Sequence, residues 1–327
     1  MRTGKPSLSV VIVSFNSARL IGGLLTALAE QLNELRAQII VVDNASSDGS
    51  ADLIADQYPW VNLIRSRQNL GFAAGNNLAV RQALAPVILF LNPDAIPIAG
   101  TILRGLEQFR EDKRIGLAGA RLLGEDGATQ PSARMFPNLL QEIFVLSGLA
   151  AKYPRSKWFG HLDRTWADAD TPAQVDWVPG AFALMRTDLF KQLGGFDERY
   201  FLYYEEVDLC RRIAQAGYCV QYLPALKATH CGGASARTIE GEAVSQNGNQ
   251  LTLWRARSGL LYYRKHHGWL TAWAVNRLER AWYALRSLKA RLRGQLDKAL
   301  EMGRHRDLLI RAWSETMGGR VAPPRPW

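Results

Sequence analysis

The sequence predicts an α/β protein with a mostly parallel central sheet flanked by helices. The first observation is the uninterrupted apolar run Val87–Leu91, which is typical of a strand buried on both faces. The second is that short apolar runs alternate with helical patterns from Leu8 to Ala120, as in successive βαβ units with right-handed connections. The chain has 327 residues, of which 47% are hydrophobic and 21% charged, so it can bury the large core that such a fold needs.

Strands and helices alternate through the first part of the chain. Strands are expected at Leu8–Ser14, Gln38–Val42, Val61–Arg65, Val87–Asn92 and Gly116–Ala120. Helices are expected after the capping residue Ser17, at Ser50–Gln57, from the loop Asn69–Asn77 to near Leu84, and at Ile98–Phe109. The first apolar run follows basic residues but is too short for a signal peptide, so we interpret it as the first strand.

The second part of the chain starts irregularly and then regains a pattern. Residues 124–176 carry four prolines and predict an insertion or lid, with one helix at Leu139–Leu149. Further elements are expected as a strand at Trp177–Arg186, a helix at Thr187–Leu193, a helix from Glu205 to near Gly217, a strand at Tyr218–Tyr222 and a loop at Thr229–Ser235. We therefore expect one domain over residues 1–250 and a helical tail over residues 251–327.

The tail concentrates the positive charge of the protein. The net charge is +10, and from Thr252 onward there are sixteen Lys and Arg but five Asp and Glu, so the preceding residues are close to neutral. Trp and Leu recur among these basic residues at helical spacing, which predicts basic amphipathic helices lying on an anionic membrane surface. The alternatives are helices that pack on the body with a solvated basic face, or nucleic-acid binding, which we do not favour. No stretch has the length of a transmembrane helix.

The three cysteines, Cys210, Cys219 and Cys231, lack metal-ligand spacing. They indicate reduced, mostly structural thiols in a cytosolic protein. A disulfide between Cys219 and Cys231 is the alternative for an oxidising compartment.

Carboxylates follow three of the expected strands or strand–helix junctions, namely Asp43, Asp94 and the group Glu205, Glu206 and Asp208. Ligands of open α/β sheets bind outside the carboxyl ends of the strands, so these side chains can converge on one crevice. One carboxylate would accept from a base or ribose, one would hold a divalent cation on a diphosphate, and one would act as a general base. The alternatives are a turn or cap for Asp94, and helix-start anions for the glutamates.

Two common nucleotide motifs are absent from the sequence. There is no GxxxxGK[ST] phosphate loop, and the first strand is followed by Ser14–Ala18 where a dinucleotide-binding protein carries its glycine fingerprint. The sequence thus excludes P-loop and dinucleotide-binding functions.

Six motifs together resemble family 2 glycosyltransferases, and within them the rhamnosyltransferase-like branch. In order they are Val11–Asn16, Val41–Ser50, Asn69–Asn76, Leu91–Asp94, Gly180 with Gly194–Asp197, and Tyr204–Arg211. The resemblance spans about Leu8 to Ser235. It implies a GT-A fold, a nucleotide-diphosphate sugar as donor, Mg²⁺ or Mn²⁺ as cofactor, and inversion at the anomeric carbon.

The resemblance also implies roles for single residues. Asp94 matches the last member of the metal-binding DxD motif, whose first position is Asn92 here, and His230 matches a histidine near the diphosphate or metal. Glu206 matches the general base, which is usually the Asp of a Glu-Asp pair, so Asp208 and Glu205 stand as alternative catalytic residues.

Donor binding is expected from residues in the remaining motifs. Asp43 matches the aspartate that contacts the base, and Gly71 lets the backbone approach the nucleotide. The other donor-binding candidates are Ser14, Asn16, Asn69, Asn76, Trp177 and Gly180. Instead of binding the donor, Asn69 and Asn76 could shape their loop, and Trp177 could pack in the core.

These features predict an inverting transfer of rhamnose from dTDP-rhamnose to a cell-surface polysaccharide or lipid-linked glycan. The enzyme is expected to be cytoplasmic and peripheral at the inner face of the plasma membrane, with no nucleic-acid partner and with homo-oligomerisation left open. The alternatives are transfer of another hexose, a catalytically inactive sugar-nucleotide-binding scaffold, and a nucleotidyltransferase, which would need an N-terminal phosphate loop that Ser14–Arg19 lacks.

Overall fold

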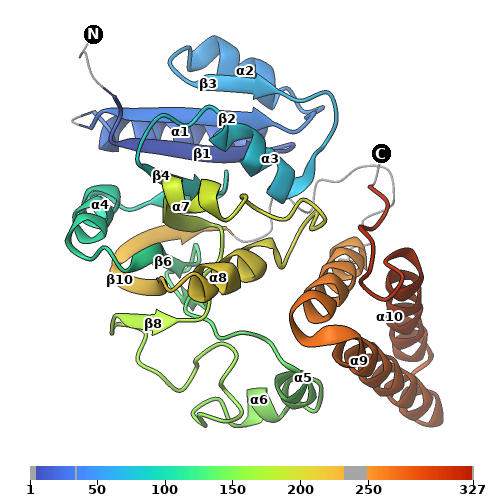
Figure 1. Cartoon of the computed structure of the whole chain (residues 1–327). Coiled ribbons are helices and arrows are strands. Elements are labelled where there is room, and N and C mark those ends of the chain that lie inside the picture. The colour runs from blue at the N-terminus through green and yellow to red at the C-terminus, as the bar shows by residue number, and fades with distance from the viewer. Residues whose placement is uncertain (1–4, 34, 232–248, 326–327) are drawn as a thin grey trace.

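The protein is described by a computed structural model, which covers residues 5–33, 35–231 and 249–325. A twisted sheet lies between layers of helices, and two long C-terminal helices stand beside this body (Figure 1). The first elements are β1 (Leu8–Ser14), α1 (Ala18–Gln31), β2 (Ala37–Asp43), α2 (Ser50–Gln57), β3 (Asn62–Arg65), α3 (Gly71–Val80), β4 (Val87–Leu91), β5 (Ala95–Pro97), α4 (Thr101–Glu111) and β6 (Ile115–Leu123). They are followed by β7 (Thr129–Gln130), α5 (Leu139–Leu146), α6 (Leu149–Lys152), β8 (Ala173–Val175), β9 (Phe182–Arg186), α7 (Thr187–Gln192), α8 (Glu205–Gln215), β10 (Cys219–His230), α9 (Asn249–Leu292) and α10 (Leu296–Glu315).

The strands form one mixed sheet in the order β3-β2-β1-β4-β9-β6-β10-β5, with β7 beside β6 and β8 beside β10. The first four strands of this order are parallel to one another. Strand β9 runs antiparallel between β4 and β6, whereas β6 and β10 are again parallel. Strands β1, β2, β3, β4, β6 and β10 therefore point the same way, which confirms the expected α/β fold class.

The strands are buried on both faces, because their side chains alternate between two hydrophobic layers. In β1, Val11 belongs to one buried cluster, and Val10 and Ile12 belong to the other. In β4, Phe90 packs in the first cluster and Leu89 in the second. Continuous apolar runs are what such doubly covered strands require.

The loop expected at Asn69–Asn77 is wrong, because α3 already starts at Gly71 and ends at Val80. The small residues serve close packing instead. A Cβ on Gly75 would lie 3.0 Å from Cγ1 of Val13 in β1, and Gly71 has a φ of +80° with no room for a side chain beside Phe201. Glycine at Gly71 is therefore required for conformation and for space.

Other boundaries differ from the expected ones at the site. Strand β5 after Asp94 was not expected, and β10 continues to His230, so the expected loop at Thr229 begins inside a strand. The rest of that loop, residues 232–235, lies outside the described residues. The strand expected from Trp177 starts only at Phe182. All three cysteines are unpaired.

The C-terminal helices pack on the body through the first half of α9. Trp254 is fully buried and stacks on Phe201, with 4.4 Å between the ring centroids. The Ser258 hydroxyl donates to the Leu202 carbonyl at 2.8 Å, and Arg257 Nε donates to Glu315 Oε2 of α10 at 2.7 Å. Helix α9 is broken at Gly268, whose backbone is not helical. Among the helices of the described residues, none is both long enough and apolar enough to span a bilayer.

Candidate active site

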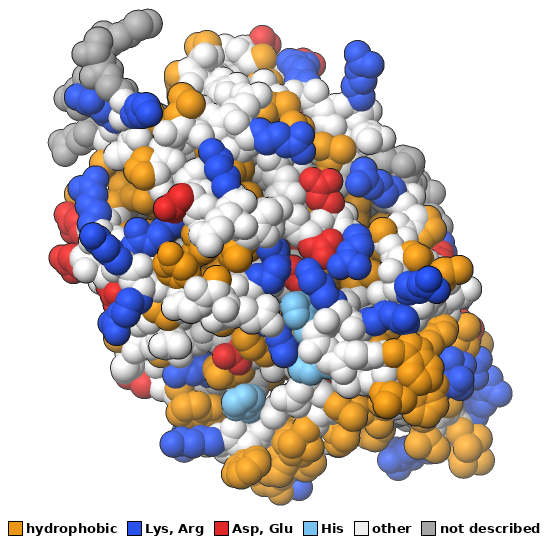
Figure 2. All heavy atoms as spheres, in the orientation of Figure 1, with side chains coloured by type: hydrophobic (Ala, Val, Ile, Leu, Met, Phe, Trp, Pro, Cys, Tyr) orange, Lys and Arg blue, Asp and Glu red, His pale blue; other side chains and the backbone are white. Residues whose placement is uncertain are grey.

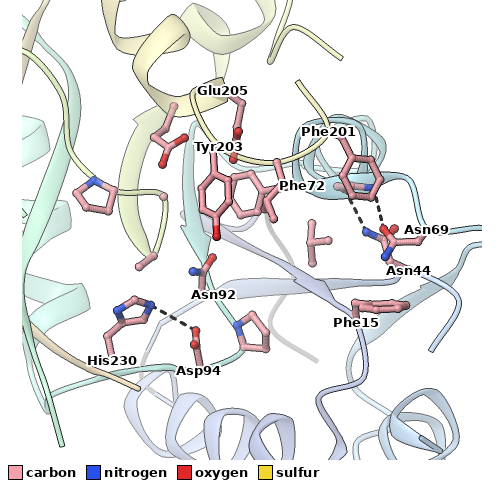
Figure 3. A pocket seen from close by; sticks show the side chains of 18 residues that line it. Phe15, Asn44, Asn69, Phe72, Asn92, Asp94, Phe201, Tyr203, Glu205 and His230 are labelled. Atoms are coloured by element: carbon pink, nitrogen blue, oxygen red, sulfur yellow. Dashed lines mark hydrogen bonds and ion pairs between the residues drawn. The ribbon is translucent and has the colours of Figure 1, made fainter. Parts of the chain in front are cut away.

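A cavity of about 310 Å³ opens at the carboxyl ends of β1 and β4. Its walls come from the residues after these strands, the start of α3, the segment before β9, the segment before α8 and the end of β10 (Figure 3). Of the residues expected at the site, the cavity is lined by Asn69, Gly71, Asn92, Asp94, Gly180, Glu205, Glu206 and His230. Segments more than 200 residues apart in sequence thus meet at the edge of the sheet where ligands of α/β folds bind.

Asp94 and His230 meet because β5 pairs antiparallel with β10. Ala95 is the register partner of His230, and the Cys231 amide donates to the Asp94 carbonyl at 3.1 Å. The His230 Nε2 atom lies 3.5 Å from Asp94 Oδ1, and a dashed line marks this contact in Figure 3. The unexpected strand β5 is therefore what turns Asp94 towards the histidine.

The second nitrogen of His230 is held by Gln130. The Gln130 Nε2 donates to the His230 carbonyl at 2.9 Å, and its Oε1 lies 2.8 Å from His230 Nδ1. Because an amide oxygen only accepts, Nδ1 donates to Gln130, and Nε2 is the ring nitrogen that faces Asp94. A histidine prepared in this way is typical of metal ligands.

Asp94, His230 and Asn92 are together a small donor set for a divalent cation. The described part of the chain has no group of three or more His, Cys, Asp or Glu residues placed to hold a metal. Mg²⁺ is commonly held by one or two carboxylates together with substrate phosphates, so a set of this size fits a cation that arrives with a diphosphate.

Glu205 and Glu206 open α8 and line the same cavity, and Figure 3 shows Glu205 on the wall opposite Asp94 and His230. The two preceding residues, Tyr203 and Tyr204, have φ values of 69° and 65°, a conformation that is unusual for tyrosine and that sets the entry angle of the helix. The Oε2 atoms of both glutamates are buried and lack a hydrogen-bond partner among the described residues. Two unsatisfied carboxyl oxygens beside a cavity indicate a site for a polar ligand.

Burial and the charge of Glu206 raise the pKa of Glu205 well above its ordinary value. Burial also raises the pKa of Glu206, although a backbone hydrogen bond, the charge of Arg134 and a hydrogen bond with Glu205 oppose this. The two carboxyl groups therefore titrate as a pair. The pKa of Glu205 is raised further than that of Glu206, so Glu206 is the member of the pair that ionises more readily.

Asp208 lies on the far side of α8 and does not line the cavity. It is fully buried and is contacted by Lys265 Nζ at 2.6 Å, His266 Nε2 at 2.7 Å and Arg212 Nε at 2.8 Å. Burial alone would raise its pKa, but the His266 hydrogen bond and the Arg212 and Lys265 charges lower the pKa overall. Through these contacts Asp208 links α8 to α9. Because it faces away from the cavity, its position favours a structural role over a catalytic one.

Asp43 ends β2 beside the cavity but does not line it. Its Oδ2 accepts from the Ser46 amide at 3.0 Å, while its buried Oδ1 lacks a partner among the described residues. The next residue, Asn44, does line the cavity and donates to the Gly71 carbonyl at 3.1 Å. An unsatisfied acceptor one residue from the cavity is consistent with a contact to the base or ribose of a nucleotide.

Four other expected donor-binding residues are outside this cavity. The hydroxyl of Ser14 is 2.6 Å from that of Ser17, and Asn16 Oδ1 accepts from the Ser47 amide at 2.8 Å. Asn76 donates to the Phe72 carbonyl at 2.9 Å and is buried. Trp177 donates to the Met135 carbonyl at 3.0 Å and lines an adjoining cavity. These contacts give each of the four a structural role.

The aromatic lining of the cavity is not among the features predicted from the sequence. Phe15, Phe72, Phe201 and Tyr203 all face it. The signal was present in the aromatic run Phe201–Tyr204 directly before the glutamates, which suits stacking on a base or sugar ring.

The fold is the GT-A fold. The fold is similar to that of the mannosyltransferase PcManGT from Pyrobaculum calidifontis, solved in complex with GDP-Man and Mn²⁺, with a TM-score of 0.56 and 18% identity over 96% of this chain and 88% of that one. It is also similar to GalNAc-T7, solved with UDP, GalNAc and Mn²⁺, with a TM-score of 0.57 and 16% identity over 85% of this chain and 51% of that one.

The Glycosyl transferase family 2 model matches residues 9–194, and the chain belongs to this family. It is therefore an inverting family 2 glycosyltransferase. Among its relatives, the rhamnosyltransferase WbbL of Escherichia coli is 31% identical over 78% of this chain and 95% of its own length. An N-acetylglucosaminyl-diphospho-decaprenol L-rhamnosyltransferase of Mycobacterium tuberculosis is 29% identical over 68% of this chain and 75% of its own length. The dTDP-rhamnosyl transferase RfbF of Shigella flexneri is 25% identical over 74% and 76%, respectively.

Proposed function

We propose that the enzyme transfers rhamnose from dTDP-rhamnose to a hydroxyl group of a lipid-linked or cell-surface glycan, with Mg²⁺ or Mn²⁺ as cofactor. The observation that carries this proposal is that one cavity is lined on one wall by Asp94 and His230 and on the other by Glu205 and Glu206. The sugar and the nucleotide are chosen because three relatives are named as rhamnosyltransferases and one of them as dTDP-dependent.

Glu206 is the general base in this proposal. It removes the proton of the acceptor hydroxyl as the oxygen attacks the anomeric carbon from the face opposite the leaving diphosphate. Glu205 keeps Glu206 ionised by donating a hydrogen bond to it. A single displacement inverts the anomeric centre without a covalent intermediate.

Asp94, His230 and Asn92 hold the diphosphate end of the donor. When a divalent cation is bound there, it neutralises the charge that develops on the leaving diphosphate. Asn44, Asn69 and the backbone at Gly71 face the nucleotide end, where Asp43 supplies its unsatisfied oxygen.

Residues 1–250 form the catalytic domain in this proposal, and residues 251–327 form a tail that binds an anionic membrane on the cytoplasmic side. The tail exposes large apolar side chains among its basic residues, which suits an interfacial position.

The test is a panel of nucleotide sugars assayed for metal-dependent release of nucleoside diphosphate. We expect dTDP-rhamnose to be used at least tenfold faster than UDP- and GDP-hexoses, with loss of activity in chelator and recovery with Mn²⁺ or Mg²⁺. Transfer is then measured with an N-acetylglucosaminyl diphosphate ester of a short prenol, since one relative is named for an acceptor of that kind. Faster turnover of another nucleotide sugar would reject rhamnose as the donor sugar.

The second candidate function is a sugar-nucleotide-binding protein without turnover. Glu206 in place of the usual aspartate and Asn92 at the first DxD position favour it. Tight nucleotide-sugar binding in calorimetry together with no turnover of any donor in the panel would select it.

A further inference from the structure

A second cavity of about 420 Å³ adjoins the first and shares Pro179, Tyr203 and Glu206 with it. Its other walls come from several separate parts of the chain. The segment before α5 and α5 itself contribute Arg134 and Glu142, and α9 contributes Arg255. Glu206 thus stands at the boundary between two cavities and is reached from both.

The lining of the second cavity differs from that of the first. It combines aromatic rings, including those of Tyr203 and Tyr204, with two guanidinium groups. The Arg134 Nε atom is buried without a hydrogen-bond partner among the described residues, while its Nη2 pairs with Asp163. Arg255 is exposed at the cavity. Aromatic surfaces beside planar charged groups are suited to a sugar that carries an anion.

The charges around Arg255 leave it available to an anion. Its acidic neighbours are Glu142 and Glu279, and Glu142 already accepts a hydrogen bond from the Tyr263 hydroxyl at 2.7 Å. Burial and the charge of Glu142 raise the pKa of Glu279 to about 8, so this group is mostly protonated at neutral pH. Of the two acidic neighbours, this leaves Glu142 to balance the positive charge of Arg255.

We propose that the second cavity is the acceptor site and that it binds a glycosyl phosphate or diphosphate, with the sugar hydroxyl at Glu206 and the phosphate at Arg255 and Arg134. This rests on the proposed function, because it takes Glu206 as the base for the acceptor. The donor then occupies the first cavity and approaches Glu206 from the side of Asp94. The acceptor occupies the second cavity and approaches Glu206 from the side of α5 and α9. The cavity is bounded by the first turns of α9, through Thr252 and Arg255, and the same helix exposes apolar side chains from Trp269 onward.

The experiment compares three acceptors that carry the same sugar, N-acetylglucosamine. They are its diphosphate ester of a short prenol, its 1-phosphate and its neutral methyl glycoside. We expect the unmodified enzyme to prefer both anionic acceptors to the glycoside. Equal rates of transfer to the 1-phosphate and to the prenyl diphosphate would show that the enzyme recognises the phosphate. A higher rate with the prenyl ester would indicate a further contact with the lipid.

Arg255→Ala should raise the KM for the anionic acceptors about tenfold or more, the loss expected for one charge-assisted contact. It should leave the KM for dTDP-rhamnose and transfer to the glycoside unchanged. Arg291→Ala is the matched control, because it removes one exposed arginine from α9 away from the cavity. Arg134→Lys keeps the positive charge near Asp163 and should raise the KM for the anionic acceptors more than the KM for the glycoside.

Equal effects of Arg255→Ala on charged and neutral acceptors would overturn the proposal, as would an Arg255→Ala enzyme that matches the control. Donor hydrolysis in the absence of acceptor separates this failure from that of the proposed function. An enzyme that hydrolyses dTDP-rhamnose but shows no arginine effect keeps its donor chemistry and loses only this acceptor site.

Discussion

Glu205 and Glu206 are adjacent carboxyl groups that titrate as a pair, and variants of each can show which of them is the base. Glu206→Gln should lower kcat by a factor of about 10² to 10⁴, the usual contribution of a general base, while the Kd for nucleotide remains the same. Glu205→Gln should retain activity to within about tenfold, because the amide still donates to Glu206. Steady-state kinetics and nucleotide titration measure both, and the opposite ranking of the two variants would make Glu205 the base.

The same pair gives a pH dependence with a definite sign. The pKa values of both glutamates are raised in the folded protein, so the native state binds more protons than the unfolded state above pH 4.5. Stability then falls as the pH rises through the folded pKa values. Glu205→Gln removes part of this penalty, so its gain in melting temperature should grow from pH 4 to pH 8 in thermal melts. A gain that does not change with pH would contradict the raised pKa of Glu205.

Asp94 is expected to contribute to binding of the metal and diphosphate and not to the stability of the fold. Asp94→Asn keeps the size of the side chain and its acceptor oxygen but removes the charge beside His230. Transfer and donor hydrolysis should both fall at least a hundredfold, and Mn²⁺ should no longer tighten nucleotide binding. Calorimetry with dTDP, with and without Mn²⁺, measures this coupling. Asn92→Ala is the companion variant, and a metal effect that survives in both variants would place the cation elsewhere.

At the level of elements, α8 is positioned by α9. Asp208 on α8 is fully buried between Lys265 and His266 of α9 and Arg212 of its own helix. Its neighbour Asp197, just after α7, pairs with Lys265 and Arg199. The C-terminal helices therefore fix the orientation of the helix that carries both glutamates, which is a reason for the tail to be retained with the catalytic domain.

Asp208→Asn should destabilise the protein by about 3–5 kcal/mol, because it leaves buried positive charge uncompensated. The pKa of Asp208 is lowered in the folded state, so its contribution is present above its unfolded value of about 3.8 and is lost as the pH falls below it. Chemical denaturation at pH 7 and pH 3 should show the difference between variant and parent shrinking at the lower pH. Exposed Asp307→Asn on α10 is the control, and an equal effect of the two would contradict an anchoring role.

The elements around the site also show what could be predicted from the sequence. The strands β1, β2 and β4 are recognisable because burial on both faces makes them continuous apolar runs. The start of helix α3 is predicted as a loop because its glycines serve packing against Val13 and Phe201, which are contacts distant in sequence. Strand β5 is three residues long and exists through its pairing with β10, so no local pattern announces it.

The same reasoning applies to the site residues. Asp94, Glu205 and Glu206 follow from their motifs and positions after strands or at a helix start. Asp208 lies two residues from Glu206, and the turn of α8 sends it to the opposite side, where its partners are in α9. The second cavity was not predictable, because its walls come from residues 134–142, 162, 177–179, 203–207 and 252–255, which only the tertiary fold brings together.

At the level of the whole molecule, the C-terminal helices have one side on the body and another side exposed. The exposed apolar side chains there include Trp269, Leu270, Trp273, Leu285, Leu288, Leu292, Leu296 and Leu300. Figure 2 shows hydrophobic side chains gathered over the region of α9 and α10, with Lys and Arg side chains among them. An apolar surface set among basic residues is what an anionic bilayer would bind.

This surface should be tested by substitution and not by deletion of the tail. Deletion from Thr252 would remove the buried Trp254 and uncover Phe201 in the wall of the first cavity, so loss of activity would not report on membranes. The exposed leucines Leu285, Leu288 and Leu292 lie at helical spacing on α9, and their side chains are 63%, 55% and 80% exposed. Replacing them should therefore leave the melting temperature within a few degrees of the parent.

We expect the triple change of Leu285, Leu288 and Leu292 to Ser to lower the partition onto anionic liposomes at least tenfold, since each buried leucine contributes about 1.5–3 kcal/mol. Binding of the parent should also fall with added salt and with neutral lipid, because the basic residues act through a screened attraction. Leu103→Ser on α4 is the matched control, being 48% exposed on the catalytic body. Co-sedimentation with liposomes measures both, and binding by the triple variant equal to that of the control would refute membrane attachment through this face.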